Sequence, residues 1–128
     1  MRVLIVESEN GLATIWQRHL QRMGMTVSRV GGQADAIEFL STEDTDVIIL
    51  DLLLADGSAL AVADYASYRL PDARVIFVTN TSFFSDGSIF SFASNACAFV
   101  QSATPPEDLA AMVEHYGPTE DATSNSAS

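Results

Sequence analysis

Lysine is absent from this sequence of 128 residues, which carries six arginines against 17 acidic residues. The formal net charge at pH 7 is therefore −11. Proteins that bind DNA or RNA neutralise phosphates with Lys and Arg, so this balance predicts no nucleic-acid partner. The same excess of negative charge predicts no docking on anionic membranes.

Cysteine and long hydrophobic runs are also scarce. Cys97 is the single cysteine, which excludes an intramolecular disulfide and indicates a reducing compartment. The apolar run at the N-terminus is too short for a signal peptide, and no run is long enough to span a membrane. We therefore expect a cytoplasmic protein.

Strand-like and helix-like segments alternate along the chain, and 48% of the residues are hydrophobic. Apolar runs of a length typical of buried strands cover residues 3–6, 25–30, 46–51, 74–79 and 96–100. Segments with helical spacing cover residues 12–23, 34–40, 58–68, 85–94 and 105–116, and Ser58 and Thr104 are candidate helix caps. We expect one α/β domain over residues 1–117 and a flexible polar tail over residues 118–128.

Polar side chains gather where these strands end. In a parallel sheet with right-handed crossovers, all carboxyl ends of the strands meet at one edge, which is where ligands bind. The residues at that edge include Glu7, Ser8, Asp51, Thr79 and Ser102. Sequence therefore predicts an acidic pocket at this edge, centred on Asp51.

Glu7 and Asp51 end two central strands, and two neighbouring carboxylates repel each other. A divalent cation removes this repulsion, and Mg²⁺ in particular prefers oxygen ligands and retains several waters. A carboxylate neutralised in this way can attack phosphorus and form an acyl phosphate. The hydroxyl of Thr79 could then hydrogen-bond the phosphoryl group.

Four stretches of the sequence resemble the receiver domain of response regulators from two-component signalling. They cover residues 3–9, 47–58, 75–79 and 106–109, and the second is the most specific. The resemblance extends over nearly all of residues 2–116. It implies a flavodoxin-like, doubly wound sheet of five parallel strands in the order 2-1-3-4-5, with five helices.

The resemblance also implies a role for individual residues. Asp51 would be the phosphoacceptor, Thr79 the switch hydroxyl and Phe99 the switch aromatic. Mg²⁺ would be held by Glu7, Asp51 and the backbone carbonyl of Leu53, with Ser8 as a weaker candidate ligand.

Three positions depart from the family pattern. Ser8 stands where the family has a second acid, Ser102 stands where it has a lysine, and Ala55 replaces a proline. The missing ammonium would pair with the phosphoryl group, and such a hydrogen bond contributes about 1.5–3 kcal/mol. Its loss would weaken the phosphorylated switch by roughly tenfold to a hundredfold.

The leading hypothesis is a stand-alone receiver domain, not an enzyme, that accepts a phosphoryl group from a sensor histidine kinase or a phosphotransfer protein. It would signal to a downstream protein through the surface formed by residues 85–94, 96–100 and 105–116, and a homodimer is a further expectation. Phe83, Phe84, Phe90 and Phe92 crowd the segment before residues 96–100; some of them are expected in the core, and two or more outside it would form an apolar patch that binds partners.

Two alternatives remain at the level of sequence. The first is a degenerate receiver that acts as an interaction or dimerisation module without phosphorylation, as Ser8 and the missing lysine allow. The second is a flavodoxin-like small-molecule binder or enzyme. The loop at residues 7–9 argues against it because two acids there would repel a phosphate, and no glycine-rich phosphate loop occurs.

Overall fold

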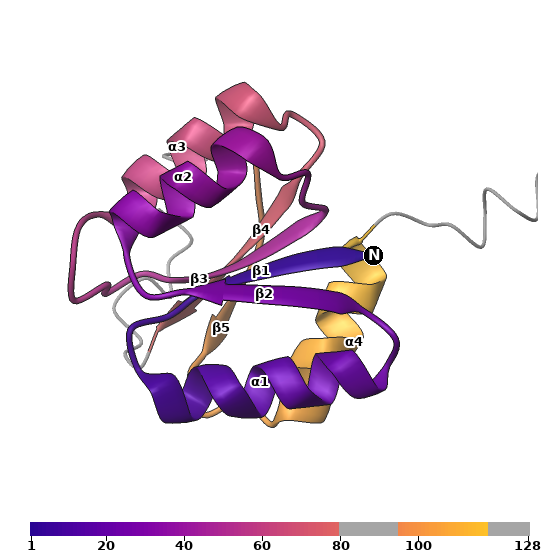
Figure 1. Cartoon of the computed structure of the whole chain (residues 1–128). Helices are drawn as coiled ribbons and strands as arrows, with labels where there is room; N and C mark the ends of the chain where they lie inside the picture. The colour runs from indigo at the N-terminus through magenta and orange to yellow at the C-terminus, as the bar shows by residue number, and fades with distance from the viewer. Residues whose placement is uncertain (80–94, 118–128) are drawn as a thin grey trace, which may run out of the picture.

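Segments rich in apolar residues form the strands of the computed structural model, which describes residues 1–79 and 95–117. The five strands make one parallel sheet in the order β2-β1-β3-β4-β5 (Figure 1). Their bounds are β1 Arg2–Val6, β2 Thr26–Val30, β3 Val47–Asp51, β4 Arg74–Thr79 and β5 Ala96–Gln101. The predicted sheet and its strand order are confirmed.

Helices cover both faces of the sheet. The described part of the chain contains four helices: α1 Asn10–Arg22, α2 Gln33–Thr42, α3 Ala59–Arg69 and α4 Pro106–Tyr116. Helices α2 and α3 lie on one face, and α1 and α4 lie on the other (Figure 1). The fifth predicted helix (85–94), the phenylalanine cluster and the tail (118–128) fall outside the described residues. None of the four helices is long and apolar enough to cross a membrane.

The period-two alternation of each strand divides the core into two layers. Val3, Ile5 and Ile49 pack with Trp16 of α1 on the α1/α4 side. Their neighbours in the strands, such as Leu4, pack on the α2/α3 side. Because both faces of a central strand are buried in this way, its sequence is apolar throughout rather than alternating.

The helix caps agree with the sequence at α3 but not at α4. The hydroxyl of Ser58 accepts a hydrogen bond from the amide of Ala61 at 3.3 Å, as predicted. The predicted cap by Thr104 is wrong, because the Pro105 carbonyl accepts the first helical bonds, from Asp108 at 2.9 Å and Leu109 at 3.1 Å. Helix α4 therefore begins one residue later than a cap at Thr104 requires.

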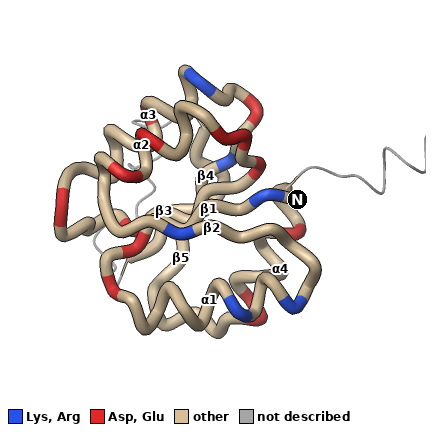
Figure 2. The backbone as a smooth tube through the Cα atoms, viewed as in Figure 1, with Lys and Arg blue, Asp and Glu red and all other residues tan. Residues whose placement is uncertain are grey.

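Acidic positions recur along the helices and loops of both layers (Figure 2). Basic positions are few, as the six arginines of the sequence require. Within the described residues, the negative charge is thus spread over both layers and is not confined to one site.

Candidate functional site

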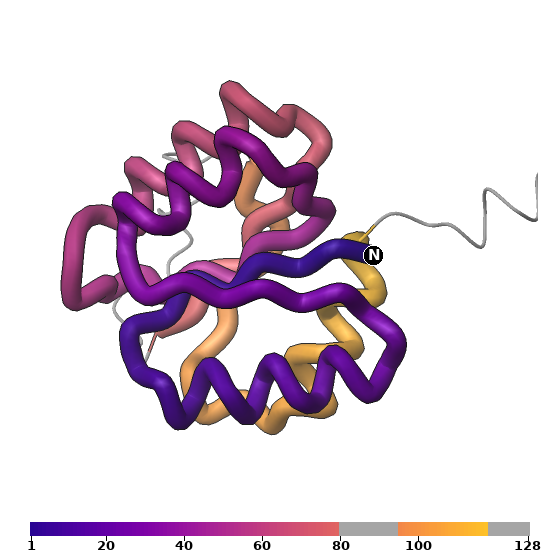
Figure 3. The backbone as a smooth tube through the Cα atoms, viewed as in Figure 1, coloured from indigo at the N-terminus to yellow at the C-terminus, as the bar shows by residue number. Residues whose placement is uncertain are grey.

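The register of the central strands places Glu7 beside Asp51. Val6 of β1 pairs with Leu50 of β3, and each carboxylic acid is the next residue along its strand. The amide of Glu7 still donates to the carbonyl of Val30, at 3.1 Å, so the backbone of β1 keeps its course up to the acid. The carboxyl ends of β1 and β3 reach the same edge of the sheet (Figure 3). Both side chains also continue the alternation that faces α1 and α4.

A pocket of about 450 Å³ opens at this edge. Its lining residues come from the loops after β1, β3 and β5 and from the first turn of α1: Glu7, Ser8, Glu9, Leu12, Asp51, Leu53 and Ser102. The predicted acidic pocket is therefore present. The structure brings together Glu7, Ser8, Asp51, Leu53 and Ser102 from the predicted residues.

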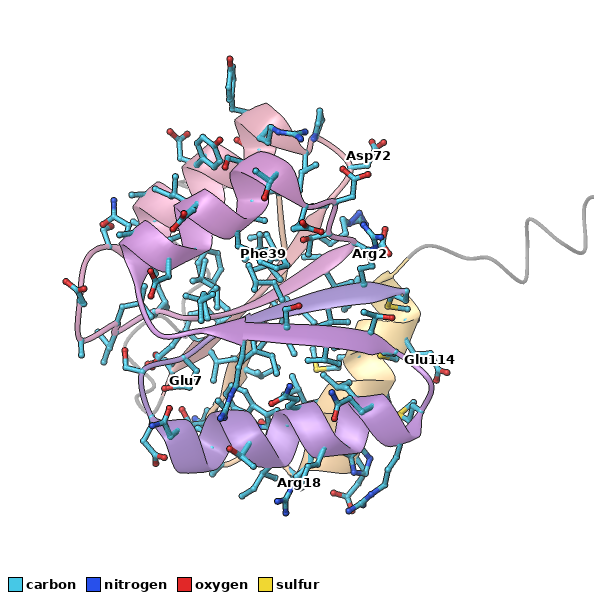
Figure 4. All side chains as sticks on the ribbon, viewed as in Figure 1. Arg2, Glu7, Arg18, Phe39, Asp72 and Glu114 are labelled. Atoms are coloured by element: carbon cyan, nitrogen blue, oxygen red, sulfur yellow. The ribbon has the colours of Figure 1, made fainter. Side chains whose placement is uncertain are left out.

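The environment of Glu7 raises the pKa of its carboxyl. Its side chain is only 5% exposed and lies at the carboxyl end of β1 (Figure 4). Burial, followed by the hydrogen bond to Asp51, raises the pKa of Glu7 from 4.5 to about 8. The negative charges of Asp51 and Glu9 also raise this pKa. The amide of Glu9, which donates to Glu7 Oε2 at 3.2 Å, opposes the rise only in part.

Among the residues that the structure describes, the second carboxyl oxygen of Glu7, Oε1, lacks the hydrogen-bond donor that would stabilise the ionised form of this side chain. Glu7 Oε1 is buried, and no donor within the described residues reaches it. An ionised carboxylate only accepts hydrogen bonds, so Glu7 and Asp51 can bond to each other only when one carries a proton. In the metal-free protein, burial and the neighbouring Asp51 therefore favour the protonated form of Glu7.

The same donor set fits a hard divalent cation. The described residues hold no group of three or more His, Cys, Asp and Glu placed to bind a metal. Two carboxylates with a backbone carbonyl are nevertheless sufficient for Mg²⁺, which keeps water in its remaining positions. A cation would also satisfy the buried Oε1 atom of Glu7, which lacks a donor. Glu7 and Asp51, with the carbonyl of Leu53, are the residues that would hold it.

Ser8 and Glu9 serve local structure as well as lining the pocket. The hydroxyl of Ser8 donates to the carbonyl of Gly31 and accepts from the amide of Ala55, both at 3.0 Å. The carboxylate of Glu9 caps α1 by accepting from the amide of Leu12 at 3.0 Å. Glu9 also lines the pocket. An acid three residues before the first apolar position of the helix was the available signal.

The two predicted switch residues lie outside the pocket lining. Thr79 is completely buried at the end of β4, and Phe99 of β5 packs against the core on the α2/α3 side. Ser102, which the resemblance aligned with a lysine, does line the pocket, and its amide donates to the carbonyl of Thr79 at 2.6 Å. A backbone link thus joins the end of β4 to the pocket wall.

Most of the chain matches one known protein family. The model of the response regulator receiver domain matches residues 3–114. The luminescence regulatory protein LuxO of Vibrio campbellii is 33% identical over 75 residues, which cover 59% of this chain and 17% of LuxO. The transcriptional regulatory protein DltR of Streptococcus agalactiae is 30% identical over 82 residues, 64% of this chain and 37% of DltR. The chain thus spans well under half of these relatives.

Solved structures agree with this match. A signal receiver domain assigned to a LuxO repressor of Vibrio parahaemolyticus is 26% identical, with a TM-score of 0.79 over 90% of this chain and 88% of that one. A CheY-like receiver domain from Methanospirillum hungatei shares the fold, with a TM-score of 0.81 at 21% identity over 89% and 90%. A response regulator of Thermotoga maritima, solved in complex with Mg²⁺ and BeF, has a TM-score of 0.77 at 22% identity over 90% and 97%.

Proposed function

The chain belongs to the response regulator receiver domain family of two-component signalling, and from this premise we propose that it accepts a phosphoryl group on Asp51. One observation supports the choice of residue. Asp51 ends the central strand β3 inside the acidic pocket, beside the buried carboxyl of Glu7. Asp56, the next acid along the chain, is exposed in the loop that follows and does not line the pocket.

The proposed reaction is a transfer between two nucleophiles. An oxygen of Asp51 attacks phosphorus, and the new O–P bond forms as the bond from phosphorus to the donor breaks. The electron pair of the broken bond stays on the donor, which is the histidine of a sensor kinase or of a phosphotransfer protein. When bound, Mg²⁺ would neutralise charge on the phosphoryl oxygens. Glu7 must release its proton to become a ligand, so its raised pKa opposes cation binding below about pH 8.

The proposed signal is a change in protein–protein contacts and not catalysis of a substrate reaction. Phosphorylation adds a charge of about −1.5 to −2 to a pocket that is already acidic. Thr79 and Phe99 would reposition in response, and the backbone link from Thr79 to Ser102 supports such a coupling. The proposed output surface combines β5 and α4 with residues 85–94, and the proposed compartment is the cytoplasm.

Intact mass measurement tests the phosphoacceptor. The protein is incubated with Mg²⁺ and a small acyl phosphate, alongside Asp51→Asn and the matched control Asp56→Asn. We expect the wild type and Asp56→Asn to gain one phosphoryl group, and Asp51→Asn to gain none. An unlabelled wild type, under conditions that label an ordinary receiver, would contradict the proposal, as would a labelled Asp51→Asn protein.

A second candidate function is an interaction module that works without phosphorylation. It is favoured by the pocket itself, where Ser102 is uncharged and the hydroxyl of Ser8 is already committed to two backbone groups. Amide NMR spectra of the labelled and unlabelled protein separate the two candidates. Phosphorylation without any shift in residues 95–117 would favour this second function.

A further inference from the structure

Ser8 connects three loops that are distant in sequence. It follows β1, yet its hydroxyl donates to the carbonyl of Gly31 after β2 and accepts from the amide of Ala55 after β3. These partners are 23 and 47 residues away from it. A hydroxyl can donate and accept at the same time, whereas an ionised carboxylate can only accept. A serine can therefore make both bonds, and an aspartate at this position would lose the bond to Gly31.

Gln33, at the start of α2, makes a second connection between the loops after β2 and β3. Its amide donates to the carbonyl of Asp56 at 3.1 Å, and its side-chain oxygen accepts from the amide of Ser58 at 2.7 Å. Gly57 lies between these partners with φ of +96°, and a β-carbon there would collide with the Gln33 side chain. The two loops lie on the same edge of the sheet as the loop after β1 (Figure 3). We call the bonds made by Ser8 and Gln33 the loop clasp.

The loop clasp holds the segment that would complete the cation site. Leu53 lies between Asp51, whose Oδ1 atom accepts from its amide at 3.0 Å, and Ala55, whose amide is held by Ser8. This short segment is therefore fixed on both sides of Leu53. Gln33 fixes the continuation of the same loop at Asp56 and Ser58, although it does not line the pocket.

We propose that Ser8 and Gln33 are positioning residues, which set the affinity of the pocket for Mg²⁺ by holding the loop after β3 and not by binding the cation. The inference rests on the proposed function, since it concerns the same cation site. It gives Ser8 a role other than that of a weakened ligand. The geometry supports it because both bonds of the Ser8 hydroxyl go to backbone groups of other loops.

The test is a titration with Mg²⁺ alone, followed by amide NMR. We expect Ser8→Ala and Gln33→Ala each to weaken Mg²⁺ binding by about two- to tenfold, the range for loss of the one hydrogen bond that each side chain makes to the loop after β3. Their combined effect should be smaller than the product of the two, because both changes loosen the same loop. Ser8→Thr, which keeps the hydroxyl, should restore the wild-type affinity.

Matched controls and a second observable separate positioning from loss of the fold. Ser67→Ala removes a serine whose hydroxyl bonds only within α3, and Gln21→Ala removes an exposed glutamine of α1, so both should bind Mg²⁺ as the wild type does. Hydrogen exchange in the metal-free protein should be slow at the amide of Ala55 and become faster in Ser8→Ala. The melting temperatures of all variants are compared so that a global loss of stability is recognised.

Three results would overturn the inference. The first is a wild-type affinity for Mg²⁺ in Gln33→Ala together with a weakened affinity in Ser8→Ala, which would indicate that Ser8 binds the cation directly. The second is rapid exchange of the Ala55 amide in the wild type. The third is the absence of any response to Mg²⁺. Failure of the proposed function would look different. The protein would still bind Mg²⁺, and both substitutions would still weaken that binding, but Asp51 would gain no phosphoryl group.

Discussion

Replacing Glu7 with glutamine removes the ionisation of a buried carboxyl while keeping its size. In the folded protein, burial and the neighbouring Asp51 raise the pKa of Glu7 from 4.5 to about 8. Between these two values the folded state binds a proton that the unfolded state has lost. Stability must therefore fall as the pH rises through this window. Below pH 4.5 both states are protonated, and above pH 8 both are ionised.

The size of the effect follows from the pKa difference. Each unit corresponds to about 1.36 kcal/mol, so the full difference represents on the order of 5 kcal/mol of unfolding free energy. The side chain is only 5% exposed, and solvent screening removes little of this cost. A glutamine resembles the protonated acid, so the variant should match the wild type near pH 5. At pH 9 it should be more stable by up to about 5 kcal/mol.

Urea denaturation from pH 5 to pH 9 measures this difference, with a chelator present to remove divalent cations. The fluorescence of Trp16 reports unfolding, because this side chain is 2% exposed in the fold. Glu114→Gln, which changes an exposed carboxylate of α4 (Figure 4), is the matched control and should keep the wild-type pH profile. Adding Mg²⁺ at pH 9 should stabilise the wild type and leave Glu7→Gln nearly unchanged, because the cation satisfies the ionised Glu7.

One outcome would refute this reasoning. If the wild type and Glu7→Gln show the same pH dependence of stability between pH 5 and pH 8, Glu7 does not hold a proton in this window. The buried Oε1 atom would then need a donor from elsewhere, and the claim that a proton opposes cation binding would fail.

Two further predictions concern the pocket and its loops. Ser102→Lys should bring an ammonium group to the pocket and lower the pKa of Glu7. The same urea denaturation series should then show a smaller loss of stability as the pH rises. An unchanged pH profile would contradict this prediction. Gly57→Ala should destabilise the protein by at least about 1–2 kcal/mol because of its positive φ and the contact with Gln33. Gly31→Ala is the control, since a methyl group there meets no atom within 4 Å; equal melting temperatures for the two variants would speak against the argument.

The strands of this fold were readable from the sequence because a central strand covered on both faces must be apolar throughout. Residues 46–51 and 74–79 were predicted as strands, and the structure has β3 at Val47–Asp51 and β4 at Arg74–Thr79. The residues at the carboxyl ends of the strands follow from the order of strands and helices along the chain. Glu7 and Asp51 are therefore placed at one edge of the sheet by the sequence alone. The predicted cap of α4 at Thr104 was wrong, because Pro105 occupies the cap position and Pro106 begins the helix.

Sequence by itself determined the sheet, its two layers and the acids at its edge, since these depend on hydrophobic periodicity and on the direction of parallel strands. Tertiary structure alone decided what the pocket residues do. The raised pKa of Glu7 requires burial at the end of β1 and the nearby Asp51, and neither is encoded by a local pattern. The sequence presented Ser8 as a lost acid, whereas in the fold its hydroxyl joins loops 23 and 47 residues away. Such contacts depend on how separate strands are brought into register, so no window of sequence contains them.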